Sequence, residues 1–246
     1  MGRVSSLLIV ASLAAAACQR APVAPAPPAA TSAQPLVAPA PSPTGRPPAL
    51  IADARLERKA IRAYEHPWSD EPMARFPNPN DHGYREVFLV DTVRPGWLRV
   101  YLPMRPNGST GWVRRADVEV RRSTLRVVVD LSSNRLSVWD GDELVMREAV
   151  ATGTGGTPTP TGLFYPRMLA KTSPSSAYGP YIFALSAYSE VLFSFAGGDG
   201  MVGIHGTNDP SSIGRDVSHG CIRMRNAAIS RLARLLPLGA PVRIRA

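Results

Sequence analysis

The chain has little cysteine: Cys18 and Cys221 are the only two in 246 residues. Cys18 ends an apolar leader, so an exported protein would have no second cysteine in its folded part to pair with Cys221. This excludes a disulfide framework there and leaves Cys221 to pair with another molecule or to serve as a reactive thiol. Because His219 and Gly220 precede it directly, Cys221 is predicted to be a nucleophile.

Long hydrophobic runs are also scarce. The longest, Leu7–Ala17, follows Arg3 and has eleven residues, too few to span a bilayer. Residues 1–18 are therefore predicted to be a signal peptide. Because Cys18 directly follows Ala15–Ala17, the leader also resembles a bacterial lipoprotein signal, which implies lipidation at Cys18. We expect an exported protein of the periplasm or cell envelope, anchored to a membrane through Cys18. The alternative is that Cys18 is discarded with the leader.

Residues 19–54 are predicted to be a semi-rigid linker, since Pro and Ala dominate from Ala21 to Pro48. Lysine is rare, so the net charge of +9 comes mostly from arginine and is scattered along the chain. Such charge suits a solvated surface or attraction to an acidic polymer. No zinc-finger, helix-turn-helix or RNA-binding motif is present. Together with export, this favours a wall polymer and no nucleic-acid partner.

Residues 55–122 are rich in short β-like runs. Candidate strands are Val87–Val90, Trp97–Leu102 and Trp112–Val113, separated by turn residues such as Pro95-Gly96. With Gly-Trp at 96–97 and again at 111–112, the segment resembles bacterial SH3-like domains. That resemblance implies a small β-barrel that binds wall or only packs against its neighbour. His66 and His82 lie in loop-like sequence with no metal-ligand spacing, so neither is expected to be functional.

Residues 123–246 are predicted to form a second, mainly β domain with at least one short helix. A hairpin is expected from Arg135–Trp139 and Glu143–Val150, and a helix from Ala227 to Leu236, with Asn226 as its N-cap and Pro237 as its end. The remaining predicted strands are Leu125–Asp130, Tyr181–Tyr188, Val191–Phe195, Met201–His205 and Val242–Arg245. Gly153–Gly156 is not a phosphate loop, because Pro158 and Pro160 forbid the helix that would follow. It is interpreted as a glycine-rich turn near a substrate cleft.

Only about 3% of an ordinary cysteine thiol is ionised at pH 7, so a nucleophile needs a base. His219, two residues away, and His205, at the end of a predicted strand, both suit this role, and their spacing does not decide between them. Gly220 permits a sharp turn, so the amides of His219, Gly220 and Cys221 could form an oxyanion hole. Zinc binding by His205, His219 and Cys221, or a buried structural cluster, are less favoured alternatives. A papain-type hydrolase is disfavoured, because there the histidine follows the cysteine.

These motifs resemble the L,D-transpeptidase (YkuD-type) family of cell-wall enzymes across roughly residues 123–246. The matching segments, in family order, are Val128–Leu131, Arg135–Trp139, Thr152–Gly153, Thr157–Gly162, Gly203–Thr207 and Ser218–Arg223. The resemblance implies a β-rich catalytic fold and two-step acyl transfer. Cys221 would attack a peptidoglycan tetrapeptide, release D-alanine and form a 3→3 cross-link.

The resemblance also implies a role for each matched residue. His205 is the general base, oriented by the backbone carbonyl of Gly206, while Asp209 and Asp216 are optional orienters. His219 and Gly220 shape the oxyanion hole with the Cys221 amide, and Ser218 and Arg223 bind substrate. No cofactor or metal is implied, and carbapenem-type β-lactams are expected inhibitors. The alternatives left open are an L,D-carboxypeptidase, an enzyme that uses a protein lysine as acceptor, and a catalytically idle wall-binding module.

Overall fold

The computed structural model describes residues 45–194 and 198–246, which fall within one compact unit. The predicted leader 1–18, lipidation at Cys18 and the linker as far as residue 44 lie outside the described residues. Within the described part, no helix has the length and apolar character needed to cross a membrane.

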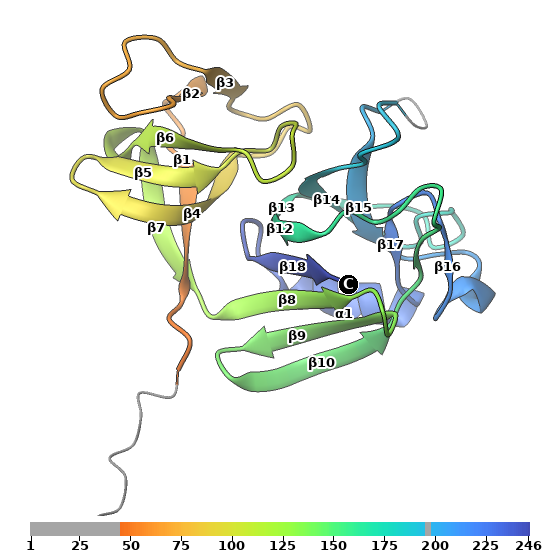
Figure 1. Cartoon of the computed structure of the whole chain (residues 1–246). Coiled ribbons are helices and arrows are strands. Elements are labelled where there is room, and N and C mark those ends of the chain that lie inside the picture. The colour runs from red at the N-terminus through yellow and green to blue at the C-terminus, as the bar shows by residue number, and fades with distance from the viewer. Residues whose placement is uncertain (1–44, 195–197) are drawn as a thin grey trace, which may run out of the picture. The chain divides into compact units, whose positions relative to one another are not determined.

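The N-terminal β region, residues 49–123, forms one five-stranded antiparallel sheet in the order β6-β5-β4-β1-β7 and a separate hairpin, β2–β3 (Figure 1). Its elements are β1 (Ala49–Ala54), β2 (Ala60–Ala63), β3 (Ala74–Pro77), β4 (Val87–Arg94), β5 (Trp97–Tyr101), β6 (Thr110–Arg114), the 3₁₀ turn η1 (Arg115–Asp117) and β7 (Val118–Ser123). The linker prediction was wrong for residues 49–54. These residues form β1, the strand between β4 and β7, because its apolar side chains enter the core.

The core of this region is built from alternating inward side chains. Phe88, Leu98 and Val113 come from three successive strands and are buried together. A bridge between Tyr64 and Trp112 joins the residue after β2 to β6. The three strands predicted from sequence lie within or next to β4, β5 and β6, whereas the SH3-like assignment remains a prediction.

The C-terminal β region, residues 125–245, forms three further sheets and one α-helix. The sheet orders are β10-β9-β8-β18-β12, β13-β14-β15-β17 and the pair β11-β16. The first elements are β8 (Leu125–Asp130), β9 (Arg135–Asp140), β10 (Glu143–Ala149), β11 (Thr152–Gly153), β12 (Gly162–Phe164), β13 (Pro166–Lys171) and β14 (Tyr181–Tyr188). They are followed by β15 (Met201–His205), the 3₁₀ turn η2 (Pro210–Ser212), β16 (Asp216–Ser218), β17 (Ile222–Arg223), α1 (Asn226–Leu235) and β18 (Val242–Arg245).

One hydrophobic core joins the two larger sheets and α1. Val129 on β8, Phe183 on β14 and Ile229 on α1 are all fully buried in it. The mainly β prediction is confirmed, including the β9–β10 hairpin and the closing strand β18, which pairs with β8 in parallel.

Two element predictions need correction. Val191–Ser194 form no strand, and Phe195 lies outside the described residues. Val191 and Phe193 are largely exposed, and the Ser189 hydroxyl accepts hydrogen bonds from the Val191 and Leu192 amides, which bends the chain away from a ladder. The helix starts at Asn226 instead of being capped by it, because the Asn226 side chain bonds to other segments.

Buried contacts join the two β regions. Tyr165 is fully buried beside Val87 and Leu89, and its hydroxyl donates to the Tyr101 carbonyl at 3.0 Å. Arg105 donates to the carbonyls of Ser189, Leu192 and Asp199 at 3.2, 3.1 and 3.0 Å. The N-terminal β region therefore packs as part of the same folded unit as the C-terminal region.

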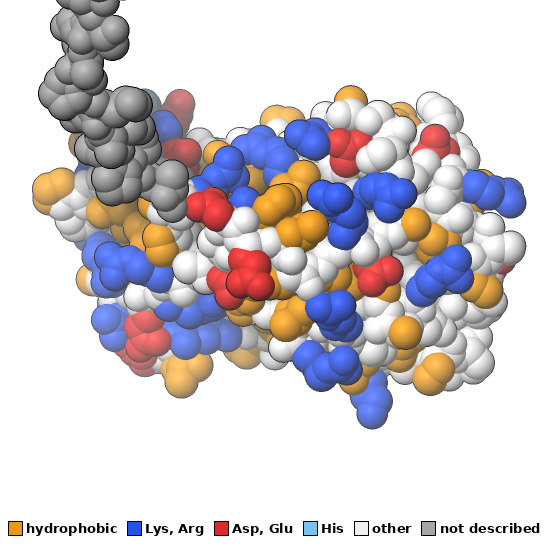
Figure 2. Space-filling model, turned by 90° about the horizontal axis from the view of Figure 1, so that it is seen from below, with side chains coloured by type: hydrophobic (Ala, Val, Ile, Leu, Met, Phe, Trp, Pro, Cys, Tyr) orange, Lys and Arg blue, Asp and Glu red, His pale blue; other side chains and the backbone are white. Residues whose placement is uncertain are grey.

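The surface bears out the scattered charge of the sequence. On the face shown in Figure 2, Lys and Arg side chains are spread among carboxylates and hydrophobic side chains. That face has no single basic stripe of the kind that tracks a nucleic-acid backbone.

Candidate active site

Two strands of the four-stranded sheet bring Cys221 and His205 into one site. β15 ends at His205, and β17 begins directly after Cys221. The strands pair in parallel, with Ile204 opposite Ile222 and His205 opposite Arg223. The Gly203 amide on β15 donates to the Cys221 Sγ at 3.4 Å. The strand pairing thus brings His205 and Cys221, sixteen positions apart in the sequence, to neighbouring positions in the sheet.

The His205 ring is held from two sides. The residue is only 4% exposed, and its Nδ1 lies 2.6 Å from the Gly206 carbonyl oxygen. Tyr178 packs edge-on against the imidazole, with 5.1 Å between ring centroids. Because a carbonyl can only accept, Nδ1 carries the hydrogen in the neutral ring. The lone pair of the neutral ring is therefore on Nε2, as a general base requires.

Gly206 permits this arrangement because it has no side chain. A Cβ at Gly206 would lie 2.5 Å from the Asn226 Oδ1 and 3.0 Å from the Gly179 Cα. Asn226 fixes the same turn by accepting from the Thr207 amide at 2.9 Å. The Gly206 carbonyl thus lies where the resemblance placed it, whereas the sequence carried no signal for Tyr178 or Gly179 and marked Asn226 only as a helix N-cap.

Burial favours the neutral forms of both the His205 imidazole and the Cys221 thiol. It lowers the pKa of His205 to about 4, since the Gly206 carbonyl only partly offsets desolvation and Arg223 adds to the effect. Burial raises the pKa of the Cys221 thiol, although the Gly203 amide and Arg223 counteract it. The arrangement suits proton removal from the thiol during attack.

Ser218 closes the loop that carries the nucleophile. Its buried hydroxyl donates to the Cys221 carbonyl at 2.6 Å and accepts from the Gly220 amide at 3.1 Å. The Gly220 amide, predicted to serve the oxyanion hole, donates to Ser218 in this structure. Gly220 is still required, since its φ of +113° is a conformation that side chains rarely adopt. Ser218 thus positions the nucleophile loop, and it also lines the cavity beside Cys221.

The segment Gly153–Thr159 packs against the nucleophile loop. The Thr159 hydroxyl accepts from the Gly153 amide and donates to the Gly220 carbonyl, both at 2.9 Å. The Thr157 hydroxyl and the Thr154 amide both donate to the Ser218 carbonyl at 3.1 Å. The glycine-rich turn therefore supports the nucleophile loop, a role that the sequence motif alone did not assign to these threonines.

A cavity of about 670 Å³ opens beside this pair. Its lining includes Cys221, His205, His219, Arg223 and Tyr178, over apolar side chains of β14 and β15. Among the described residues that line it, Arg223 carries the one guanidinium and Asp199 the one carboxylate. The cavity can thus hold a peptide whose carboxylate faces Arg223. His82, from the N-terminal β region, lines the same cavity, although its sequence context did not mark it.

Neither optional carboxylate orients His205. Asp209 accepts from the amide and hydroxyl of Ser211, and Asp216 accepts from the Thr152 hydroxyl at 2.6 Å. Among the residues that the structure describes, no group of three His, Cys, Asp or Glu side chains is arranged to hold a metal ion.

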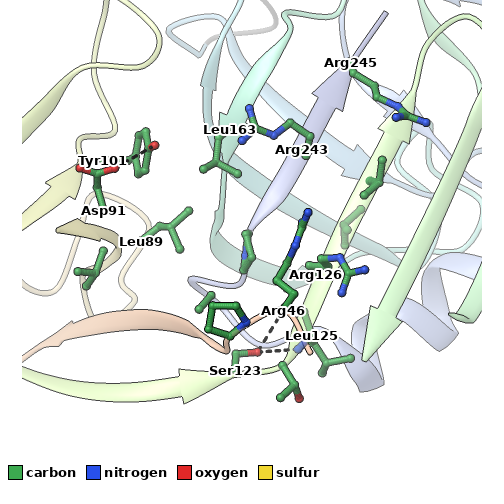
Figure 3. Close-up of a pocket in the computed structure, with 17 residues that line it drawn as sticks. Arg46, Leu89, Asp91, Tyr101, Ser123, Leu125, Arg126, Leu163, Arg243 and Arg245 are labelled. Carbon is green, nitrogen blue, oxygen red and sulfur yellow. Dashed lines mark hydrogen bonds between the residues drawn. The ribbon is translucent and has the colours of Figure 1, made fainter. Parts of the chain in front are cut away.

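A second cavity of about 430 Å³ lies away from Cys221 and His205 (Figure 3). Its lining combines Asp91 and Tyr101 of the N-terminal β region with Leu163 and Arg243 of the C-terminal one. The described residues that line it include no cysteine or histidine. It therefore lacks the nucleophile and base that the larger cavity has.

Comparison with known proteins places the match on the C-terminal β region. Residues 124–244 match the family model described as the L,D-transpeptidase catalytic domain, YkuD. YkuD of Bacillus licheniformis is 37% identical over 119 residues, covering 48% of this chain and 64% of that protein. YqjB of Bacillus subtilis is 32% identical over 130 residues, covering 48% of this chain and 69% of that protein. The chain thus spans less than two thirds of the length of the YkuD relative.

Solved structures also match. An L,D-transpeptidase from Mycobacterium smegmatis aligns with a TM-score of 0.42 and 14% identity, covering 80% of this chain and 99% of that one. The catalytic domain of an Enterococcus faecium L,D-transpeptidase aligns with a TM-score of 0.37 and 22% identity, covering 49% of this chain and 96% of that one.

Proposed function

This chain belongs to the YkuD family of L,D-transpeptidase catalytic domains, and we propose that it is a peptidoglycan L,D-transpeptidase with Cys221 as its nucleophile. One observation carries this proposal. The parallel pairing of β15 with β17 brings the strand that ends in His205 alongside Cys221. The Gly203 amide of that strand donates a hydrogen bond to the Cys221 sulfur. A neutral thiol and a neutral, fixed imidazole are the pair that general-base acyl transfer uses.

In the first step, Cys221 Sγ bonds to the carbonyl carbon of diaminopimelate, the third residue of a tetrapeptide stem. The thiol proton passes to Nε2 of His205, and negative charge develops on the carbonyl oxygen. The amides of His219 and Cys221 are the proposed donors to that oxygen. The carbon–nitrogen bond to D-alanine then breaks, the amine takes the proton from His205, and a thioester remains.

In the second step, an amine of another stem attacks the thioester carbon. His205 accepts the amine proton and returns it to the sulfur as the carbon–sulfur bond breaks. The product is a 3→3 cross-link, and the thiol is restored. Water as the acceptor would give a tripeptide, and a protein lysine would give a protein–wall bond. Arg223 holds a substrate carboxylate, since it carries the one guanidinium among the described residues that line the cavity.

The remaining proposals concern location and inhibition. Residues 1–18 direct export to the cell envelope, and a lipid on Cys18 anchors the protein to a membrane. The N-terminal β region is an SH3-like domain that binds wall. Carbapenem-type β-lactams acylate Cys221, because their strained carbonyl accepts the same attack.

The test is to incubate the purified full chain with disaccharide tetrapeptides and identify the products by mass spectrometry. A cross-linked dimer is the expected product, and Cys221→Ala should form none. Tripeptide alone would instead establish hydrolysis, and unchanged substrate would point to a binding role.

Two further variants separate the candidate bases. His205→Ala should lower the turnover rate about 10²- to 10⁴-fold, whereas His219→Ala should keep most of it.

A carbapenem should add one mass adduct to the parent protein and none to Cys221→Ala. An adduct that persists in that variant would refute the nucleophile assignment.

A further inference from the structure

The loop between β3 and β4, residues 78–86, covers the free edge of β13. β13 is the outermost strand of the sheet β13-β14-β15-β17, so its outer carbonyls have no ladder partner. The Asn80 side chain donates to the Arg167 carbonyl at 3.4 Å, and the Tyr84 hydroxyl donates to the Leu169 carbonyl at 2.5 Å. The N-terminal β region is thus docked directly onto the sheet that carries His205.

The same loop is fixed internally. The Asn80 Oδ1 accepts from the amides of His82 and Tyr84, both at 3.1 Å. The Asn80 amide donates to the Tyr84 carbonyl at 2.7 Å. At the end of the loop, Glu86 forms a buried, two-bonded ion pair with Arg167, at 3.2 and 2.7 Å. The loop therefore presents His82 in one defined position.

That position is the catalytic cavity. His82 lines the 670 Å³ cavity together with Cys221 and His205, and β13 contributes Met168 to the same lining. His82 is exposed, so its imidazole is available to a ligand. His66, the other histidine of the N-terminal β region, instead stacks on Trp68 at 4.9 Å and is outside the lining. His82 and His66 are the same residue type, and only the position of His82 at the cavity distinguishes it from His66.

We propose that His82 is a specificity-determining residue of the transpeptidase, and that it binds a carboxylate or carbonyl of the peptide substrate away from the bond that is cleaved. The inference rests on the proposed function. Cys221 and His205 supply the chemistry, whereas His82 comes from a different part of the chain and adds binding to the bound peptide. Such a contact changes affinity for a long substrate and leaves the reactivity of the thiol unchanged.

The experiment measures the dissociation constant of a disaccharide tetrapeptide by calorimetry, with the full chain carrying Cys221→Ala so that no reaction occurs. Adding His82→Ala should weaken binding about tenfold, the loss expected for one hydrogen bond to a charged group. His82→Gln, which keeps a donor, should restore part of the affinity. His66→Ala is the matched control and should stay within about twofold of the parent. Alkylation of Cys221 by iodoacetamide should be equal in His82→Ala and His66→Ala proteins that retain the cysteine.

Two results would overturn the proposal and have different meanings. Equal affinities for the His82→Ala and His66→Ala proteins, in a parent that binds the tetrapeptide, would refute the role of His82 alone. A parent that neither binds nor converts the tetrapeptide would refute the proposed function, and the role of His82 with it.

Discussion

Two of the places where the described part of the chain buries ionisable side chains treat charge in opposite ways. Where the N-terminal β region docks on β13, Glu86 and Arg167 are almost completely buried and remain paired through two hydrogen bonds. In the catalytic cavity, His205 is equally buried, but its neighbours are a carbonyl, a phenol ring and the nearby cation Arg223. The first place keeps two opposite charges in contact, whereas the second keeps His205 and Cys221 neutral near a single cation, Arg223.

The difference shows which buried groups are structural and which are ready to react. Burial raises the pKa of the Glu86 carboxyl, and the Arg167 guanidinium beside it offsets only part of that rise. No opposite charge does this for His205, so desolvation lowers its pKa to about 4 and leaves a neutral base. A group held by an opposite charge is stable as an ion, whereas a group surrounded by dipoles can exchange a proton.

The largest expected effect, on the stability of the fold, comes from changes to the Glu86–Arg167 ion pair. Glu86→Gln leaves the Arg167 charge buried without compensation and should lower the free energy of unfolding by about 3–5 kcal/mol, measured by urea denaturation. The double variant Glu86→Leu with Arg167→Met removes both charges and should be much closer to the parent in stability. If the single variant unfolds like the parent, this pair does not stabilise the docked loop.

An intermediate effect is expected from His205. Its pKa is about 4 in the folded protein and 6.5 as the ordinary value, so the unfolded chain binds more protons between these values. Acidification from pH 7 toward pH 4 should therefore lower the free energy of unfolding, by up to about 3 kcal/mol from this residue. His205→Gln should show a shallower dependence in that window. Equal slopes for the two proteins would mean that His205 is not held neutral.

The smallest effect, on the reactivity of the Cys221 thiol, is expected from Arg223, whose charge only partly offsets the effect of burial. It lowers the pKa of the Cys221 thiol, although burial raises it overall. Arg223→Gln should therefore slow iodoacetamide alkylation at pH 8 by about twofold at low salt, with the difference shrinking in 1 M salt. Arg243→Gln, on the second cavity, is the control and should alkylate like the parent. Faster alkylation of Arg223→Gln would contradict the electrostatic assignment.

Sequence patterns predicted much of the fold because local alternation decides which face of a strand is buried. The strand β8 and the hairpin β9–β10 follow directly from such patterns. The pattern failed at Val191–Ser194, where apolar residues are exposed and their backbone bonds to Arg105 and Ser189. It also failed at Asn226, whose side chain bonds to Thr207 and Pro174 instead of capping the helix. In both cases a distant partner overrode the local preference.

The sequence by itself determined the nucleophile candidate, Cys221, which has no cysteine partner in the predicted folded part, and the set of residues around it. Spacing along the chain did not choose between His205 and His219, since it does not specify which strands become neighbours, and only the family resemblance favoured His205. The tertiary structure decided which strands meet: β15 pairs with β17, which brings His205 beside the nucleophile loop, and the fold also places Ser218 on the Gly220 amide and His82 in the cavity. The physical reason is that desolvation, hydrogen-bond partners and cavity walls depend on which segments meet in space, and these segments are far apart in the chain.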